Sequence, residues 1–204
     1  MARRRQHVNS LGLGFESFRG RRPDLPAGRP VEIEIGCAEA QFLFERAARD
    51  PDRTYVGLEI RPELVDDVNR RAAAARLPVT AVFGHANHHL ADLFPPTRVA
   101  RVFVNFPDPW FKRRHHKRRL MDEDLARAIH RVLEPGGDLL FQSDVWDIVL
   151  DAMGVLDAVD HLFENRAGPW SFWRSPHPYG ARSWREAHCE ESGLPIWRLL
   201  YQKI

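Results

Sequence analysis

This chain of 204 residues has few cysteines, no long apolar run and a small net charge. Cys37 and Cys189, the only cysteines, belong to no CxxC pattern or Cys/His cluster, which excludes a disulfide framework and gives no zinc-ligand spacing. No apolar run approaches the roughly 20 residues that cross a bilayer. Polar residues 6–10 follow the first arginines, where a signal peptide would be apolar. We therefore expect a cytoplasmic protein with no metal site and no membrane contact.

Charged residues are numerous but nearly balanced. The formal net charge is +2, so any affinity for nucleic acid has to come from a local patch. A hydrophobic content of 44% with 28% charged residues is typical of a globular domain of this length. Residues 1–30 are rich in Arg, Gly and Pro without periodicity, which predicts a basic N-terminal arm that either touches RNA or is a solvated tail. Residues 31–204 make up the single predicted domain.

From residue 31 onward, strand and helix patterns alternate along the chain. Strands are predicted at 31–36, 54–60, 79–83, 101–106, 138–142 and 196–201, and helices at 39–49, 63–76, 122–133, 145–159 and 183–193. Strands that alternate with helices form a parallel sheet with right-handed crossovers. The pattern therefore predicts a doubly wound α/β fold, with a long loop at 168–179.

The stretch 102–120 carries the most specific pattern. A strand ends where Pro107 and Pro109 prevent further pairing, and the prolines leave Asp108 and Trp110 on a rigid turn. A run of basic residues follows directly: Lys112, Arg113, Arg114, His115, His116, Lys117, Arg118 and Arg119. These side chains repel one another unless a polyanion neutralises them. This basic run is either a solvated surface or a phosphate-binding patch beside an acidic turn. Trp110 either packs in the core or stacks on a base.

The turn after the first strand, residues 34–40, is where an open parallel sheet binds its ligand. The turn is poor in glycine and no P-loop lysine follows it, so a pyrophosphate cradle is absent. Glu59 closes the second strand, where an acid can accept both hydroxyls of a ribose. A cofactor with a ribose but no pyrophosphate fits, and S-adenosylmethionine is the candidate, with Glu34 toward its amino-acid end. The alternative is that both acids simply face solvent.

Taken together, these motifs resemble the bacterial tRNA (guanine-N7)-methyltransferase family over nearly the whole chain. The matching segments are residues 5–9, 34–36 and 57–59, and above all Asn105-Phe106-Pro107-Asp108-Pro109-Trp110 with the basic run after it. The resemblance implies a class I methyltransferase fold, Rossmann-like, with a mostly parallel seven-stranded sheet and an antiparallel C-terminal strand. It also implies S-adenosylmethionine as cofactor, tRNA as partner, and N7 of a guanine in the variable loop, position 46, as methyl acceptor.

Carried over residue by residue, the resemblance also implies a site. It places the cofactor against Glu34, Gly36, Glu59, His85, Asn87 and Asp108, and makes Asp108 the catalytic acid. It places the substrate against Lys112, Asp144, Ser183 and Glu186, and the RNA phosphates against Arg113, Arg114, His115, His116, Lys117, Arg118 and Arg119. The chain departs from the family in having few glycines at 36–40, in having His85 or Asn87 at an acidic position, and in having Ser183 for threonine.

Two other functions stay open at this point. A non-catalytic RNA-binding protein on the same fold would explain the missing glycines and the missing acid. A small-molecule methyltransferase would share the pocket but would have no use for the basic run. Ser183 and Glu186 also stand at the spacing of a helix capping box. We expect a monomer or a homodimer.

Overall fold

The structure is a computed structural model that describes residues 22–112, 114, 119–175 and 177–204. Residues 1–21, most of the predicted basic arm, therefore lie outside the described residues. The strands are β1 (Val31–Ile35), β2 (Thr54–Glu59), β3 (Val79–Phe83), β4 (Val99–Asn105), β5 (Leu133–Ser143), β6 (Phe163–Asn165) and β7 (Trp197–Lys203). The helices are α1 (Gln41–Arg49), α2 (Pro62–Ala75), α3 (Ala86–Leu93), α4 (Glu123–Val132), α5 (Trp146–Ala158) and α6 (Trp184–Glu191).

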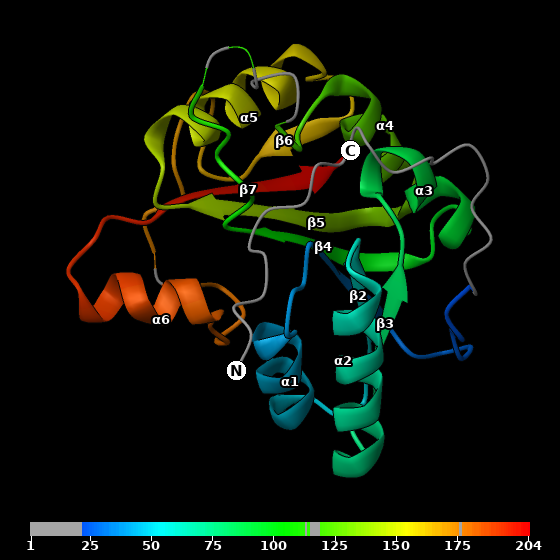
Figure 1. Cartoon of the computed structure of the whole chain (residues 1–204). Helices are drawn as coiled ribbons and strands as arrows, with labels where there is room; N and C mark the ends of the chain where they lie inside the picture. The colour runs from blue at the N-terminus through cyan, green and yellow to red at the C-terminus, as the bar shows by residue number, and fades with distance from the viewer. Residues whose placement is uncertain (1–21, 113, 115–118, 176) are drawn as a thin grey trace.

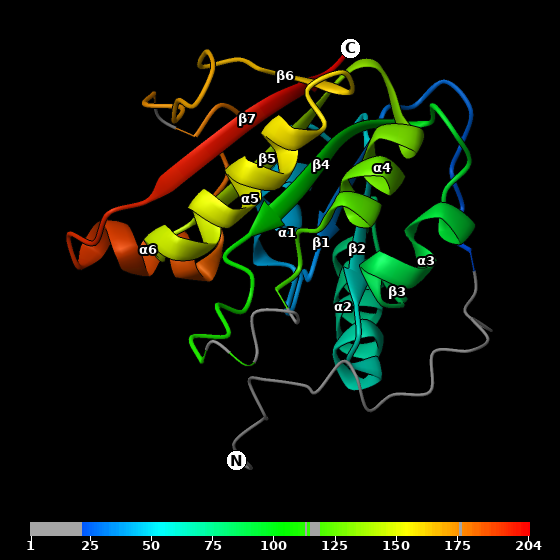
Figure 2. The ribbon, with the colours of Figure 1, turned by 90° about the horizontal axis from the view of Figure 1, so that it is seen from above.

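One seven-stranded sheet in the order β3-β2-β1-β4-β5-β7-β6 organises these elements. The pairs among β1 to β5 are parallel, whereas β7 is antiparallel to both β5 and β6. Helices α3, α4 and α5 cover one face of the sheet, and α1, α2 and α6 lie on the other (Figure 1). Helix α5 packs on β5 and β7, as the view from above shows (Figure 2). The predicted doubly wound α/β fold is confirmed.

Three elements differ from the sequence prediction. Helix α3 and the short strand β6 were not predicted; α3 contains Asn and His residues, which are weak helix formers, and it is only 8 residues long. Strand β5 begins at Leu133 instead of Asp138, because Pro135-Gly136-Gly137 forms a bulge within it. Ala100 of β4 alone faces residues 134–137 of β5, and Gly136 takes the left-handed φ of 74° that the bulge needs.

The sheet face toward α1 and α6 carries three cross-strand rows. The row near the amino ends is polar, with Glu32, Arg101 and Asp138 in register. The middle row has Phe103, Leu140 and Leu200 in register and continues to Glu34 on β1. The row near the carboxyl ends is polar again, with Asn105, Gln142 and Arg198 in register. On β4, β5 and β7, two polar rows therefore flank a hydrophobic row.

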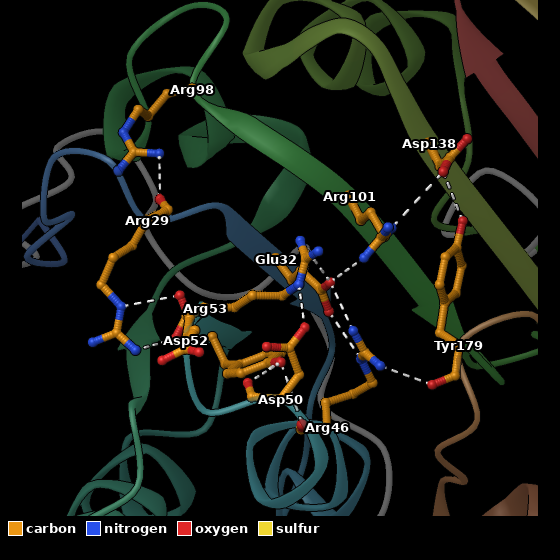
Figure 3. A network of polar contacts seen from close by, with 11 residues as sticks. Arg29, Glu32, Arg46, Asp50, Asp52, Arg53, Arg98, Arg101, Asp138 and Tyr179 are labelled. Carbon is orange, nitrogen blue, oxygen red and sulfur yellow. Dashed lines mark hydrogen bonds and ion pairs between the residues drawn. The ribbon is translucent and has the colours of Figure 1, made fainter.

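The amino-end row centres on the fully buried carboxylate of Glu32 (Figure 3). Arg46 of α1 donates two hydrogen bonds to this carboxylate, at 2.9 and 3.0 Å, and Arg101 donates a third. Arg46 also donates to the carbonyl of Tyr179, whose hydroxyl donates to Asp138 at 2.8 Å. A buried charge of this kind is tolerated only when it is paired. Through Tyr179, the network also fixes the segment before α6 to the sheet.

Within the described part of the chain, no helix is long and apolar enough to span a membrane.

Candidate functional site

A cavity of about 800 Å³ opens at the carboxyl ends of β1, β2, β3 and β4. This is the edge where doubly wound sheets bind ligands, and the volume is within the range of small-molecule sites. The cavity is lined by every residue for which a cofactor contact was predicted: Glu34, Gly36, Glu59, His85, Asn87 and Asp108. Residues that lie far apart in the chain are thus brought to one place.

The loop after β1 forms one wall of the cavity. Its backbone is tied to β2, since Gly36 N–H donates to the Leu58 carbonyl at 2.8 Å and Ala38 N–H donates to Glu59 Oε2 at 2.9 Å. Gly36, Ala38 and Ala40 all have positive φ, of 73°, 48° and 55°. Ala38 and Ala40 therefore adopt the left-handed region that glycine reaches without strain, at a cost of about 1–2 kcal/mol each.

Glu34 forms part of the cavity floor and is only 3% exposed. Its Oε1 accepts a hydrogen bond from Asn105 Nδ2 at 2.8 Å, whereas among the described residues no donor reaches the buried Oε2. Burial, with Glu59 and Glu186 nearby, raises the pKa of this carboxyl to about 8. The interpretation of Glu34 as a solvent-facing acid is wrong, because its carboxyl is buried in the cavity floor with one oxygen unpartnered among the described residues.

Glu59 is equally buried and has a different environment. Its Oε1 accepts from the backbone N–H groups of Ile60 and Arg61, at 2.9 and 3.1 Å, and Oε2 accepts from Ala38. The guanidinium of Arg61 binds both oxygens, at 2.8 and 3.0 Å. A carboxylate has about four lone-pair directions, so a ribose hydroxyl has to replace one of the Arg61 contacts. Glu59, and more weakly Glu39 and Asp108, raise the pKa of Arg61.

The wall after β3 contains the residues at the predicted acidic position. His85 precedes α3, and its backbone N–H donates to His89 Nδ1 at 2.9 Å. Burial lowers the pKa of the His85 ring to about 4. The imidazole is therefore neutral at pH 7. Asn87 donates to Asp122 Oδ2 at 2.9 Å, and Asp122 also lines the cavity. A carboxylate is thus present at this wall, but it comes from the residue before α4, to which no sequence motif pointed.

Asp108 lies on the turn after β4, in the same cavity as Glu34 and Glu59. The turn is bounded by Phe106 and Trp110, whose φ angles of 50° and 44° are unusual for aromatic residues. Strained backbone of this kind is concentrated at functional sites. Trp110 is half-buried and lines the cavity. Its position leaves both a packing role and a stacking role open.

The basic run is described only in part. Lys112 and Arg114 are exposed beside the turn. Arg119, for which a phosphate contact was predicted, lines the cavity with a mostly buried side chain. It pairs with Asp151 of α5 and donates to the Pro109 carbonyl at 3.3 Å. Arg119 thereby holds the Asp108 turn against α5. Arg113, His115, His116, Lys117 and Arg118 lie outside the described residues.

The residues for which a substrate contact was predicted are placed at different depths. Ser183 lines the cavity, and its hydroxyl caps α6 by accepting from Glu186 N–H at 3.2 Å. Glu186 does not complete the capping box, because its fully buried carboxylate binds Gln142 and Arg198 instead. Asp144 pairs with Arg185, and only Arg185 reaches the cavity lining. Lys112 lies on the surface outside it.

A hydrogen-bonded chain connects Glu34 to α6 beneath the cavity. Asn105, which donates to Glu34, accepts from Gln142 Nε2 at 2.9 Å, and the same nitrogen lies 3.0 Å from Glu186 Oε2. Arg198 of β7 completes the chain with bonds to Gln142 Oε1 at 2.9 Å and Glu186 Oε1 at 2.8 Å. This is the carboxyl-end polar row of the sheet. It joins the floor of the cavity to the helix at its mouth.

The cavity fits the cofactor expected from the sequence. The buried Glu34 carboxyl suits an ammonium group, and the Glu59 carboxylate suits a ribose hydroxyl that displaces an Arg61 contact. The volume suits a nucleoside with a short side chain. In the part of the chain that the structure describes, no group of His, Cys, Asp or Glu side chains could hold a metal ion.

Solved methyltransferases have a similar fold. Precorrin-6y C5,15-methyltransferase from Geobacter metallireducens GS-15 aligns with a TM-score of 0.56 and 20% identity, over 86% of this chain and 80% of that one. Geranyl diphosphate C-methyltransferase from Streptomyces coelicolor A3(2), solved with S-adenosyl-L-homocysteine, aligns with a TM-score of 0.54 and 14% identity, over 86% and 72% of the two chains. The strand order and the cavity are those of a class I S-adenosylmethionine-dependent methyltransferase.

Sequence comparison narrows this class. Residues 28–199 match a family model described as putative methyltransferase. The tRNA (guanine-N(7)-)-methyltransferase of Synechococcus sp. (strain WH7803) is 39% identical, over 98% of this chain and 87% of that protein. The protein of the same name from Synechocystis sp. (strain ATCC 27184 / PCC 6803 / Kazusa) is 35% identical, over 98% and 96%. The chain belongs to the tRNA (guanine-N7)-methyltransferase family, which confirms the resemblance seen in the sequence.

Proposed function

We propose that this protein transfers the methyl group of S-adenosylmethionine to N7 of guanine 46 in the variable loop of tRNA. Family membership supports the reaction and the class of substrate. The observation that carries the assignment to this site is that Asp108 shares one cavity with Glu34 and Glu59. The cytoplasm is the compartment where we place this activity, and the protein acts as a monomer or a homodimer.

The chemistry at guanine asks for alignment and charge stabilisation. N7 has a lone pair and no proton at neutral pH, so its attack requires no general base. When bound, S-adenosylmethionine supplies an electrophilic methyl group: the N7–carbon bond forms as the sulfur–carbon bond breaks, and the positive charge passes from sulfur to the base. Asp108 holds the N1 and N2 donors of guanine and offsets the charge that develops on the ring.

The second carboxylate proposed for guanine, Asp144, acts differently from Asp108. Asp144 pairs with Arg185 through one carboxylate oxygen and is not among the residues that line the cavity, whereas Arg185 is. We therefore assign to Asp144 the orientation of Arg185 at the cavity mouth. Lys112 and Arg114, exposed beside the turn, bind phosphates and give affinity without reading sequence.

Replacement of Asp108 tests the assignment. Asp108→Asn keeps the shape and removes the charge, so we expect kcat to fall on the order of 100- to 1000-fold, as for the loss of one transition-state contact. Asp108→Ala should abolish methylation, and both variants should keep most of the affinity for tRNA. Transfer of label from S-adenosylmethionine to unmodified tRNA measures the rate, and filter binding measures the affinity. Full activity of Asp108→Ala would refute the catalytic role.

The acceptor and the rival function need separate tests. Unmodified tRNA with guanine at position 46 should accept label, and the same tRNA with adenine there should not. A wild-type protein that binds tRNA but transfers no label would favour the alternative of a non-catalytic RNA-binding protein on the same fold. Label on another guanine would change the assigned position in the tRNA but would keep the assigned reaction.

A further inference from the structure

An exposed tryptophan stands at the mouth of the cofactor cavity. Trp184 is the first residue of α6, it is 67% exposed, and it lines the cavity together with Ser183 and Arg185. A single exposed aromatic residue needs no explanation by itself. Trp170 is 66% exposed, yet it is not among the residues that line the cavity. Trp184 is distinguished by its place and by how it is held.

Trp184 lies at the end of the cavity where the methyl-accepting base is expected to enter. Along the sheet edge the lining residues follow the strand order, with His85 after β3, Glu59 after β2, Gly36 after β1 and Asp108 after β4. If Glu59 marks the ribose, the adenosine end lies toward β2 and β3, and the methyl group points toward β4. The acceptor base then enters between Asp108 and α6, where Trp184 lies.

The backbone that presents Trp184 is fixed on both sides. The Ser183 hydroxyl caps the helix through Glu186 N–H, and Glu186 itself is anchored by Gln142 and Arg198 below the cavity. Arg185 is paired with Asp144 at the end of β5. A flat aromatic side chain on such a rigid element can present one face to a base without losing much conformational freedom on binding.

We propose that Trp184 stacks on the target guanine once the base is turned out of the tRNA into the cavity. The inference rests on the proposed function and names a base-binding residue of the same site. Many enzymes that modify a base turn it out of its stack, and an aromatic face then replaces the lost neighbour. The indole face also attracts cations, so its contact with the base strengthens as N7 methylation makes the ring positive. Trp184 therefore contributes to kcat as well as to tRNA binding.

The experiment compares two equally exposed tryptophans. Trp184→Ala should lower kcat/KM for unmodified tRNA by about 5- to 150-fold, the effect of losing one base–aromatic stack, with kcat itself reduced. The affinity for S-adenosylmethionine, measured by calorimetry, should stay unchanged. Trp184→Phe should recover most of the activity, and Trp170→Ala should behave like the wild type.

Further readouts separate stacking from other roles. Trp184→Leu has a bulky apolar side chain but no aromatic face, so it should remain impaired; recovery by leucine would overturn the proposal. Equal activity of Trp184→Ala and Trp170→Ala, or loss of cofactor binding by Trp184→Ala, would also overturn it. The wild type should bind 7-methylguanosine more tightly than guanosine, and Trp184→Ala should lose this preference. A wild type that methylates no tRNA would instead refute the proposed function itself.

Discussion

Glu34 is a carboxyl group enclosed by protein in the lining of the cavity, with one oxygen bonded to Asn105 and the other buried without a described partner. Its pKa is raised to about 8, first by burial and then by Glu59 and Glu186. Arg61, a cationic side chain of the same cavity, is bound to Glu59. In the protein without cofactor, Glu34 is therefore mostly protonated at pH 7. An ammonium group that binds there favours the ionised form.

Cofactor binding should thus release a proton. At pH 7, calorimetric titrations of S-adenosylmethionine in buffers of different ionisation heat should show release of up to one proton per site, and the release should vanish above about pH 9. Glu34→Gln cannot lose this proton and should show none. Release that is the same in Glu34→Gln and in the wild type would assign the proton to another group.

The same group makes stability depend on pH. The pKa of Glu34 is about 8 in the folded protein and 4.5 for a glutamate exposed to water, as in the unfolded chain. The folded state therefore binds the extra proton between these values. Its contribution to the free energy of unfolding is full below pH 4.5 and is lost as the pH rises to about 8. Unfolding midpoints measured against pH should fall less over this window in Glu34→Gln than in the wild type.

At the scale of residues, sequence reasoning found the groups whose role depends on strand ends. Periodicity and the prolines predict where the strands end, and this places Glu34, Glu59 and Asp108 near strand ends. The carboxyl ends of parallel strands share one edge of the sheet, so these carboxylates were expected near one another. Gln142 and Arg198 could not be found in this way. Their partners come from α6 and from neighbouring strands, and a register between distant segments leaves no local pattern.

Helix α6 is held in place by tertiary side-chain contacts more than by its own helix propensity. It is only 8 residues long, too short to be stable alone, and Glu186 ties it to the sheet. Removal of one partner from a buried ion pair leaves an uncompensated charge. The Glu186 and Arg198 pair therefore decides where α6 lies.

Arg198→Met should destabilise the fold by about 3–5 kcal/mol, because it strands the Glu186 carboxylate. The double variant Glu186→Gln with Arg198→Met removes the stranded charge and should recover part of this loss. Urea unfolding of the two variants and the wild type measures the difference. If the double variant is less stable than Arg198→Met, the cost lies in packing and not in charge.

At the scale of elements, the sequence predicted the long apolar strands and helices and missed the exceptions. Pro135-Gly136-Gly137 is typical both of a loop that follows a helix, which was the prediction, and of a bulge in a strand, which the structure has. The capping box at 183–186 formed only half, because Glu186 found stronger partners in the sheet. In each case a tertiary contact decided between two structures that the local sequence allows.

For the whole molecule, the small net charge means that tRNA affinity depends on where the cations lie. Lys112 and Arg114 are exposed and follow directly on the Asp108 turn, which lines the cavity. Phosphate contacts release counterions, so the slope of log K against log salt reports how many of them a protein makes.

Lys112→Ala with Arg114→Ala should reduce the magnitude of this slope by about 1.5, which corresponds to two lost phosphate contacts. Arg70→Ala on α2 is the control, because Arg70 is highly exposed but lies outside the cavity lining. Binding isotherms of one tRNA at several salt concentrations measure the slopes. An unchanged slope in the double variant would place the phosphates elsewhere.

The apolar row of Phe103, Leu140 and Leu200 separates the two polar rows of the sheet face. On these three strands the two polar rows have no side chain in common. A substitution around Glu32 should therefore lower the stability of the fold more than it disturbs the cavity floor at the opposite edge.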